Sequence, residues 1–596
     1  MFGRRKKNYD GTDAEKRLAL SMSGRKMPSV RQLMHLPRFL SPKESLFMKL
    51  LLSLMGVSLI IMGTKFVSDR TEQVPDVGGS YEEAAVGQPR LINPILTNAN
   101  DTDLDIIRLV FSGLMRVDGS GRLVPDLAES VTTSEDGKTY TAKLRSGVKW
   151  HDGSPFTSQD VVETINYIKT PAWKSPLAGQ FKNVDVKADG DLTVIFTLQA
   201  PFEPFLSTLT VGLLPAHLWH DVKPENAARA ELNLKPIGTG PFHFKSLVKD
   251  TKGNIRAYLL ARNEDYYDKP AHLTSIGFKF YPDFSSAEEA LKGHKADGIS
   301  FLPLELRDDV QNLRTTDIIT LKLPQYTAVF FNLKKNEALK SKAVRQALSL
   351  AVDRTKIIRD ILKNSAEPAR GPIPPGFIGY ATDTSGSVYD LTKAADLLDQ
   401  DGWKLDDDGI RKQDVKDAKG KVTGKTNLAI TLVTVDSKEN VAVAEAVKDA
   451  WVGLGVQTEL SVVPASRIQK DVIRPRDYDA LLYGEIVGAD PDLYPFWHSS
   501  QATEQGLNLS MFANRTADAL LEQSRTTAND EERAADYQKF QAILADEMPA
   551  AFLYRPTYVF GMSRKIKGFN VQTIFTPADR FADITDWYTE MTTKWK

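Results

Sequence analysis

The sequence lacks cysteine altogether and has no excess of either charge. Without cysteine there is no disulfide bond, thiolate zinc site, cysteine nucleophile, thiol redox motif or cysteine-linked lipid anchor. The 76 basic and 77 acidic residues give a net charge of −1, whereas a nucleic-acid-binding domain usually carries a basic excess. We therefore expect no nucleic-acid partner. The 596 residues, 42% of them hydrophobic and 26% charged, indicate two or three folded domains.

One long apolar run lies near the N-terminus, LFMKLLLSLMGVSLIIMGT (Leu46 to Thr64), with one charge at Lys49. At about 1.5 Å per residue, these roughly 19 residues cross a hydrocarbon core of roughly 30 Å. Residues 1–45 are rich in Lys and Arg, so the positive-inside rule places them in the cytoplasm and the main domain outside the membrane. We expect a basic cytoplasmic tail (1–45), a transmembrane signal anchor (46–64) and an irregular tether (65–85) in a single-pass protein of the cell membrane.

A cleaved signal peptide is the alternative interpretation, because the apolar stretch from Leu50 to Gly63 is long enough for one. Against cleavage, the basic region is far longer than that of a signal peptide, and GTKFVSDR has no small-x-small site. We therefore predict that the mature protein keeps residues 1–64.

The segment from Asp136 to Tyr167 combines two predicted strands, a turn and a helix. TYTAKL alternates apolar and polar residues as a half-buried strand does, and the extended piece around Val148 and Trp150 follows it. A turn at HDG then precedes apolar residues at helical spacing, namely Val161, Val162, Ile165 and Ile168.

The amino-acid sequence of this segment resembles the signature segment of the extracellular solute-binding proteins of ABC importers, family 5. That family includes dipeptide, oligopeptide and nickel binders. Three further segments resemble family segments in family order: LVFSGLMRVDGSGRLVPDLAES (109–130), IGTGPFHFKSL (237–247) and LKSKAVRQALSLAVDRTKIIRDIL (339–362). The resemblance covers the chain from about residue 86 to the end. It implies an α/β fold, a two-lobed periplasmic-binding-protein-like clamshell of type II, of the large cluster with an extra subdomain in lobe one.

The implied clamshell divides the chain into lobe one (86–325, with an inserted subdomain at about 120–233), lobe two (326–557) and a return to lobe one (558–596). We place the first hinge near Pro324 to Thr327 and the second in AAFLYRPTYVFGM (550–562). Within lobe two, the pattern over residues 428–462 predicts a strand, a helix and a strand, and hence a parallel pair. The charged loop from Lys404 to Lys425 is typical of a solvated hairpin.

Three motifs allow a chemical interpretation and a structural one. His217 and His220 have a spacing that can place two imidazoles on one helix face, but no third metal ligand follows at a motif spacing. The pair His151-Asp152 could serve acid–base chemistry, yet a turn explains it, and no G-x-S-x-G elbow accompanies it. GTGP at 238–241 lacks the Lys-Ser/Thr of a phosphate loop, so we expect a tight turn beside the cleft, where Thr239 could meet ligand.

Further ligand contacts are predicted on both lobes. Asn93 and Asn332 could point into the cleft, or each could stabilise a turn. Arg370 could pair with a ligand carboxylate in a forked geometry, or lie on the surface. Three aromatic residues are predicted to line the pocket, with core packing as the alternative: Tyr483, Trp497 and Tyr554.

The stretch YGEIVGADPDLYPFWHSSQ (483–501) departs from the family pattern. Peptide binders of the family carry an aspartate here, four residues ahead of a proline, that meets the peptide's α-ammonium. Counting back from Pro491 gives Val487 instead. Because a buried unpaired charge is strongly unfavourable, another acid must serve, and we expect Asp490 first and Glu485 second.

These observations predict a substrate-binding protein of an ABC importer, not an enzyme, that captures an oligopeptide or dipeptide and delivers it to the permease. Its expected partners are the solute, the permease and ATPase subunits and the membrane; we expect a monomer without cofactor or metal. The alternatives are an extracytoplasmic sensor or chaperone-like receptor, an extracytoplasmic hydrolase, and a binder of a nickel chelate, glycan or opine.

Overall fold

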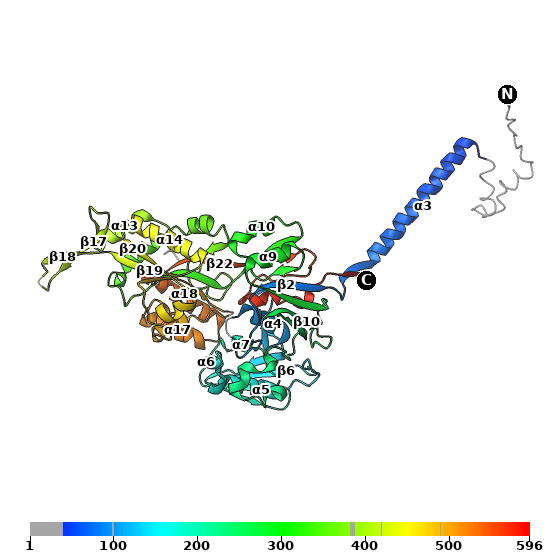
Figure 1. Cartoon of the computed structure of the whole chain (residues 1–596), viewed down its shortest axis with the longest axis horizontal. Coiled ribbons are helices and arrows are strands. Elements are labelled where there is room, and N and C mark those ends of the chain that lie inside the picture. The colour runs from blue at the N-terminus through cyan, green and yellow to red at the C-terminus, as the bar shows by residue number, and fades with distance from the viewer. Residues whose placement is uncertain (1–39, 98–99, 382–387, 419, 489, 596) are drawn as a thin grey trace, which may run out of the picture. The chain divides into compact units, whose positions relative to one another are not determined.

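The computed structural model describes residues 40–97, 100–381, 388–418, 420–488 and 490–595. The chain forms two compact units, a large one from Asp76 to Glu590 and a small one that combines the residues before it with those after it. The described part of the small unit consists of helix α3 (Pro42–Arg70) and strands β1 (Thr71–Pro75) and β23 (Met591–Trp595) (Figure 1).

Helix α3 begins with a capping box between Ser41 and Glu44 and continues for 29 residues. It is long and apolar enough to cross a membrane by length and composition. The expected irregular tether takes a different form here, because residues 65–70 extend α3 and residues 71–75 form β1, which pairs antiparallel with β23. Local patterns could not reveal this pairing, since the partner strand lies more than 500 residues further along the chain.

The large unit is built on one sheet of 12 strands that both lobes share. Its order is β20-β19-β21-β14-β22-β12-β2-β11-β10-β9, and β13 and β15 also pair with β22. Lobe one contributes β2 (Ser80–Val86), β9 (Phe242–Lys249), β10 (Ile255–Arg262), β11 (Ser275–Tyr281), β12 (Gly298–Ile299) and β13 (Thr316–Lys322). Lobe two contributes β14 (Gln325–Phe331), β15 (Ala366–Pro368), β19 (Ala429–Val435), β20 (Gln457–Val463) and β21 (Ala480–Ile486).

Strand β22 (Ala550–Ser563) crosses between the lobes. Its first residues pair with β14 and β15, and its last residues pair with β13 and β12. The other crossing is the short link Leu323-Pro324 between β13 and β14. The first predicted hinge, Pro324 to Thr327, begins within this link, and the second, 550–562, lies within β22; that either segment acts as a hinge stays a prediction.

The helices of lobe one and the inserted subdomain follow the predicted order in outline. Helices α4 (Asp101–Val110), α9 (Phe284–Lys292) and α10 (Arg307–Gln311) belong to lobe one. The insert contains β3 (Met115–Val117), β4 (Leu123–Pro125), β5 (Ala128–Thr133), β6 (Thr139–Leu144), α5 (Ser158–Lys169), α6 (Ala178–Phe181), β7 (Val184–Ala188), β8 (Thr193–Leu198), α7 (Phe205–Thr208) and α8 (Ala216–Trp219). The second strand expected near Val148 is only an isolated bridge between Lys149 and Pro155.

Lobe two places helices on both faces of its part of the sheet. They are α11 (Lys342–Leu350), α12 (Arg354–Lys356), α13 (Leu391–Gln400), α14 (Lys438–Gly453), α15 (Ala465–Ile468), α16 (Tyr494–Trp497), α17 (Arg515–Thr526) and α18 (Asp530–Glu547). Alternate residues of β14 enter opposite cores, Val329 on one face and Phe330 on the other, as the two-residue repeat of a strand requires.

Two sequence predictions for lobe two agree with the structure. Strands β19 and β20 pair in parallel across α14, as the strand–helix–strand pattern predicts. The charged loop forms a sheet of β16 (Lys404–Leu405), β17 (Arg411–Lys416) and β18 (Val422–Asn427), whose last two strands make the expected hairpin. In Figure 1 this hairpin projects from the end of lobe two.

Candidate functional site

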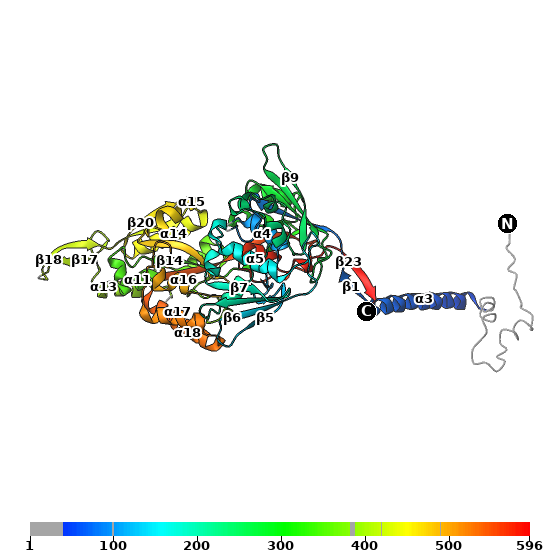
Figure 2. The same cartoon turned by 90° about the horizontal axis from the view of Figure 1, so that it is seen from below.

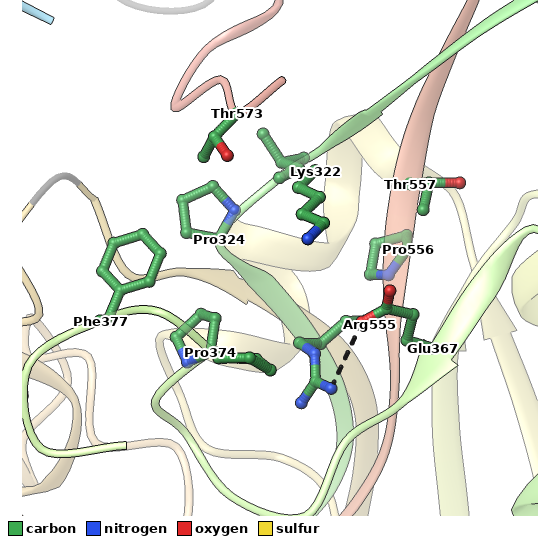
Figure 3. Close-up of a pocket in the computed structure, with 11 residues that line it drawn as sticks. Lys322, Pro324, Glu367, Pro374, Phe377, Arg555, Pro556, Thr557 and Thr573 are labelled. Carbon is green, nitrogen blue, oxygen red and sulfur yellow. Dashed lines mark ion pairs between the residues drawn. The ribbon is translucent and has the colours of Figure 1, made fainter. Parts of the chain in front are cut away.

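The boundary between the lobes contains two cavities at the crossing strands and one beside the inserted subdomain. We call the first the hinge cavity; it measures about 50 Å³ and is lined by Lys322, Leu323, Pro324, Glu367, Pro374, Pro375, Phe377, Arg555, Pro556, Thr557 and Thr573 (Figure 3). Both hinges and the proline-rich loop of lobe two contribute to it. Phe377 of this lining makes an edge-to-face contact with Phe575 of lobe one, with ring centroids 5.9 Å apart.

The hinge cavity carries more positive than negative charge. Arg555 pairs with Glu367 at 3.6 Å, the ion pair that Figure 3 marks, and Lys322 lies between Pro324 and Pro556. Burial lowers the pKa of Arg555, as does the charge of Arg370, while Glu367 raises it. The exposed Arg370 therefore lies close enough to act on this site. An anionic group is the ligand that such a surplus of cations favours.

A second hinge cavity of about 180 Å³ lies around the same crossing strand and includes Tyr554, Tyr558, Arg307 and Glu439 among its lining residues. Tyr554, predicted to contact ligand, thus lines a cavity between the lobes. Its pKa is raised to about 12, chiefly by burial.

The largest of these cavities, which we call the interlobe cavity, measures about 770 Å³. Its lining comes from the insert (residues of α6, β8, α7 and the segment 199–204) and from lobe two (the loop before α16 and helix α17). Ligand cavities in proteins usually occupy about 300–1,000 Å³. This cavity is therefore large enough for a short peptide.

The two lobes contact each other beside the interlobe cavity through Arg525. Its backbone oxygen accepts a hydrogen bond from the Glu203 amide at 2.9 Å. Its guanidinium lies 3.8 Å from the Tyr494 ring centroid and 5.4 Å from that of Phe202, and it pairs with Asp492 at 2.5 Å. One arginine of lobe two thus bridges to the inserted subdomain of lobe one.

Of the two acids expected to replace the family's aspartate, only Asp490 lines a described cavity. Its carboxylate already accepts two hydrogen bonds from Arg533 of α18, one of them at 3.0 Å. A ligand ammonium at Asp490 would therefore share that carboxylate with the guanidinium. Val487 is buried in the core of lobe two, and its amide donates to Pro324 at 2.8 Å.

Glu485 is buried and accepts a hydrogen bond from the Tyr326 hydroxyl. Burial raises the pKa of Glu485 to about 8, although the Tyr326 hydrogen bond and the Arg476 charge act in the opposite direction. Glu485 is therefore mainly neutral at pH 7 and lines none of the three interlobe cavities. A neutral buried acid is poorly suited to receive an ammonium group.

Other predicted contacts lie within the packed interior. Asn93 donates to Asn233 at 3.0 Å and accepts from the Ile95 amide, while Asn332 donates to the Arg476 carbonyl and accepts from the Lys334 amide. These bonds match the turn-stabilising alternative for both. Trp497 is buried against Phe330 and Phe552, and the half-buried Tyr483 packs against the same core.

The motifs with competing interpretations have local hydrogen-bond partners. His217 contacts Asp152 at 2.7 Å, and His151 contacts the Gly240 carbonyl at 2.9 Å while accepting from the Gly238 amide. Across the described ranges, no group of three His, Asp or Glu could hold a metal ion. The buried Thr239 hydroxyl has no hydrogen-bond partner in the part of the chain described here.

The glycines flanking Thr239 are required by close backbone approach. A Cβ added to Gly238 would lie 1.9 Å from the Val110 carbonyl oxygen, and one added to Gly240 would lie 2.5 Å from that of Leu109. The GTGP motif forms a bend against the end of α4, and the contact of Thr239 with ligand stays a prediction.

Sequence reasoning missed the residues that carry most of the charge between the lobes, namely Lys322, Glu367, Asp492, Arg525 and Arg555. Two of them had a usable signal, because Lys322 and Arg555 each adjoin a proline-marked crossing. Arg525 lies on the surface side of an ordinary amphipathic helix, and only the packing of α17 against the insert brings it to the boundary.

Comparison with known proteins extends over most of the large unit. The family model for "Bacterial extracellular solute-binding proteins, family 5 Middle" matches residues 122–506. The oligopeptide-binding protein AppA of Bacillus subtilis (strain 168) is 28% identical over 86% of this chain and 92% of its own length. The dipeptide-binding protein of Escherichia coli (strain K12) is 25% identical over 82% and 91%, respectively.

Solved structures agree in fold. AppA of Bacillus subtilis, in complex with a nonapeptide, superposes with a TM-score of 0.68 at 28% identity, covering 86% of this chain and 99% of that one. NikZ of Campylobacter jejuni, in complex with Ni(L-His), gives 0.70 at 29% identity over 85% and 99%. Substrate-binding protein CtaP of Listeria monocytogenes gives 0.74 at 28% identity over 86% and 100%.

Proposed function

Because the chain belongs to family 5 of the bacterial extracellular solute-binding proteins, which are substrate-binding proteins and not enzymes, we propose that it captures a peptide between its lobes and delivers it to an ABC permease. The observation that carries this proposal is the interlobe cavity of about 770 Å³, lined by residues of both lobes. A ligand that touches both lobes binds the closed form better than the open one, and this difference drives closure.

A peptide suits the charges at the boundary between the lobes. Its carboxylate could meet Lys322 and Arg555 of the hinge cavity, which outnumber the single acid Glu367; the charge of Arg370 also acts on Arg555. Its ammonium could meet Asp490, which lines the interlobe cavity. We keep Asp490 as the first choice for the amine, because Glu485 is buried and mainly neutral.

Calorimetry tests this assignment. The full chain in detergent is purified, and its co-purifying ligand is identified by mass spectrometry. Binding of an identified peptide is then compared with that of its N-acetylated form, in wild type and in Asp490→Asn. If the ammonium meets Asp490, acetylation and the substitution each cost about 2–5 kcal/mol of binding, and together no more than either alone.

The matched control is Glu485→Gln, which should bind the peptide as wild type does. Unchanged affinity on acetylation and in Asp490→Asn would exclude amine recognition at this site. A nickel chelate or other non-peptide solute in the mass spectrum would overturn the peptide proposal while keeping a substrate-binding role.

We further propose that α3 holds the protein in the cell membrane, with the residues before it in the cytoplasm and the large unit outside. The apolar run of α3 and the basic residues that precede it support this topology. N-terminal sequencing of the mature protein should begin at or near residue 1. A mature N-terminus at residue 65 or later would show instead that the helix is a cleaved signal.

A further inference from the structure

The last described strand of the chain lies next to the first residues after the apolar helix. Helix α3 ends at Arg70, and β1 begins at Thr71 without an intervening loop. Trp595 of β23 pairs directly with Thr71, and the Gln73 side chain donates to the Thr593 hydroxyl at 2.6 Å. Figure 2 shows β23 alongside β1 at this end of the helix. The C-terminal strand is therefore fixed beside the outer end of the apolar span.

Trp595 differs from the other tryptophans in its exposure. The sequence has eight tryptophans, and the other seven are buried in the large unit, whereas Trp595 is 66% exposed. Tryptophan combines a large apolar ring with one polar N–H, and it concentrates where a membrane meets water. An exposed tryptophan at the end of an apolar helix therefore indicates a lipid environment.

The height of this tryptophan above the hydrocarbon core follows from helix geometry. Six residues separate Thr64, the end of the apolar run, from Arg70, which at 1.5 Å per residue is roughly 9 Å. Counted from Val67, which is also apolar, the distance is roughly 5 Å. The headgroup layer on each side of the core is roughly 5–8 Å thick. Counted from Val67, the end of α3, and with it Trp595, lies in that layer; counted from Thr64, it lies just beyond the outer edge of the layer.

The neighbouring side chains suit lipid headgroups as well. Phe66 is 53% exposed and lies under the Arg70 guanidinium, 4.3 Å from its ring centroid. Lys594 is exposed and pairs in register with Glu72. Aromatic rings at the boundary and cations that reach phosphate are the combination found at membrane interfaces.

We propose that the ribbon of β1 and β23 is a second membrane contact, in which Trp595 inserts among the headgroups of the outer leaflet beside α3. This inference rests on the proposed membrane anchor. The large unit would then be joined to the membrane surface at both of its ends, since the chain enters it at Asp76 and leaves it at Glu590. The partner is the lipid bilayer itself.

Tryptophan quenching in nanodiscs tests the proposal. The full chain is placed in phosphatidylcholine discs with and without a lipid spin-labelled just below its headgroup, and the emission of Trp595→Phe is subtracted from that of wild type. We expect the spin label to remove most of the Trp595 component. The matched variant is Trp595→Phe with Met591→Trp, because residue 591 lies on the same face of the ribbon, roughly 13 Å further along β23. The emission that Met591→Trp adds should not be quenched by the spin label.

The outcomes separate the two proposals. If the discs retain the protein but quenching is equal at positions 595 and 591, the headgroup contact is overturned and the anchor stands. The same holds if the discs retain the protein and position 595 is not quenched. Loss of the protein from membranes on alkaline washing overturns the anchor and the contact together. Selective quenching at 595 supports both.

Discussion

Each lobe buries a tyrosine hydrogen-bonded to a glutamate, but among the described residues only the glutamate of lobe one forms an ion pair with an arginine. In lobe one, Tyr81 contacts Glu83, and Arg580 reaches both Glu83 at 2.8 Å and Asp105 at 2.6 Å. In lobe two, Tyr326 contacts Glu485, for which no ion pair is found within the described residues. The same local motif thus belongs to a buried ionic junction with Arg580 in one lobe and is a neutral pair near pH 7 in the other.

A buried acid acquires its role from the groups that pack against it. Burial raises the pKa of Glu83, and Arg580 opposes that rise. Burial is the largest influence on both acids, and it raises the pKa of Glu485, which has no ion pair within the described residues, to about 8. Lobe one thus holds its buried glutamate in an ion pair with Arg580, whereas lobe two carries a buried acid that titrates near neutral pH.

Replacing Arg580 should have the largest effect. The change Arg580→Met leaves Glu83 and Asp105 buried without their cation, and breaking a buried pair from one side costs about 3–5 kcal/mol. Hydrogen exchange should show lobe one opening more readily, with lobe two protected as before. The control is Arg564→Met, which removes a pair with Asp317 at 2.8 Å that is half-exposed on both sides and is worth only about 0–1 kcal/mol. Equal losses in the two variants would contradict the comparison.

The second prediction concerns pH and Glu485→Gln. The side chain ionises near 4.5 in the unfolded chain and near 8 in the fold. The stabilisation from its neutral form is thus fully present below 4.5 and is lost as the pH rises to 8. Across this window the free energy of unfolding of lobe two should fall by up to about 1.4 kcal/mol per pH unit.

Glutamine stays neutral at every pH, so the variant should remove this slope. The measurement is chemical unfolding of wild type and variant between pH 5 and 9, with hydrogen exchange in β14 and β21 used to monitor lobe two. The exposed Glu129→Gln serves as control and should keep the wild-type profile. A slope that persists in Glu485→Gln would assign the titration to another group.

The smallest expected effects come from removing the tyrosine hydroxyls. Tyr326→Phe leaves the buried Glu485 without its donor, at a cost of about 1–3 kcal/mol, whereas Tyr81→Phe should cost about 0.5–1.5 kcal/mol because Arg580 still binds Glu83. Tyr326→Phe should also raise the pKa of Glu485, since the lost hydrogen bond lowered it. The midpoint of the pH-dependent unfolding reports that shift. A midpoint that moves downward would contradict the account.

Much of the fold could be predicted from the sequence, because it depends on local periodicity. The alternation in β7 and β8 and the helical spacing in α14 are visible in a few residues each, and prolines mark both crossings. The pairing of β1 with β23 could not be predicted, since an isolated five-residue strand looks irregular until its distant partner is known.

The candidate site was less predictable than the fold. Asp490 and Tyr554 line cavities at the boundary. Asn93 and Asn332, by contrast, form side-chain hydrogen bonds within their own lobes. Glu485 lies near the end of a strand, where a charged residue is usually exposed, yet it is buried and hydrogen-bonded to Tyr326 of β14. The remaining ligand assignments stay predictions, because a sequence does not specify which side chains face each other across two lobes.

The ionic junction of lobe one has a consequence for synthesis on the ribosome. Arg580 lies 475 residues beyond Asp105 and 497 beyond Glu83. At about 5–20 residues per second, elongation over that distance takes roughly 25–100 s. Throughout this time lobe one has both carboxylates but not their cation, so its ionic junction can form only after Arg580 has been synthesised. A nascent chain that stalls within lobe two would keep lobe one open to chaperones and proteases.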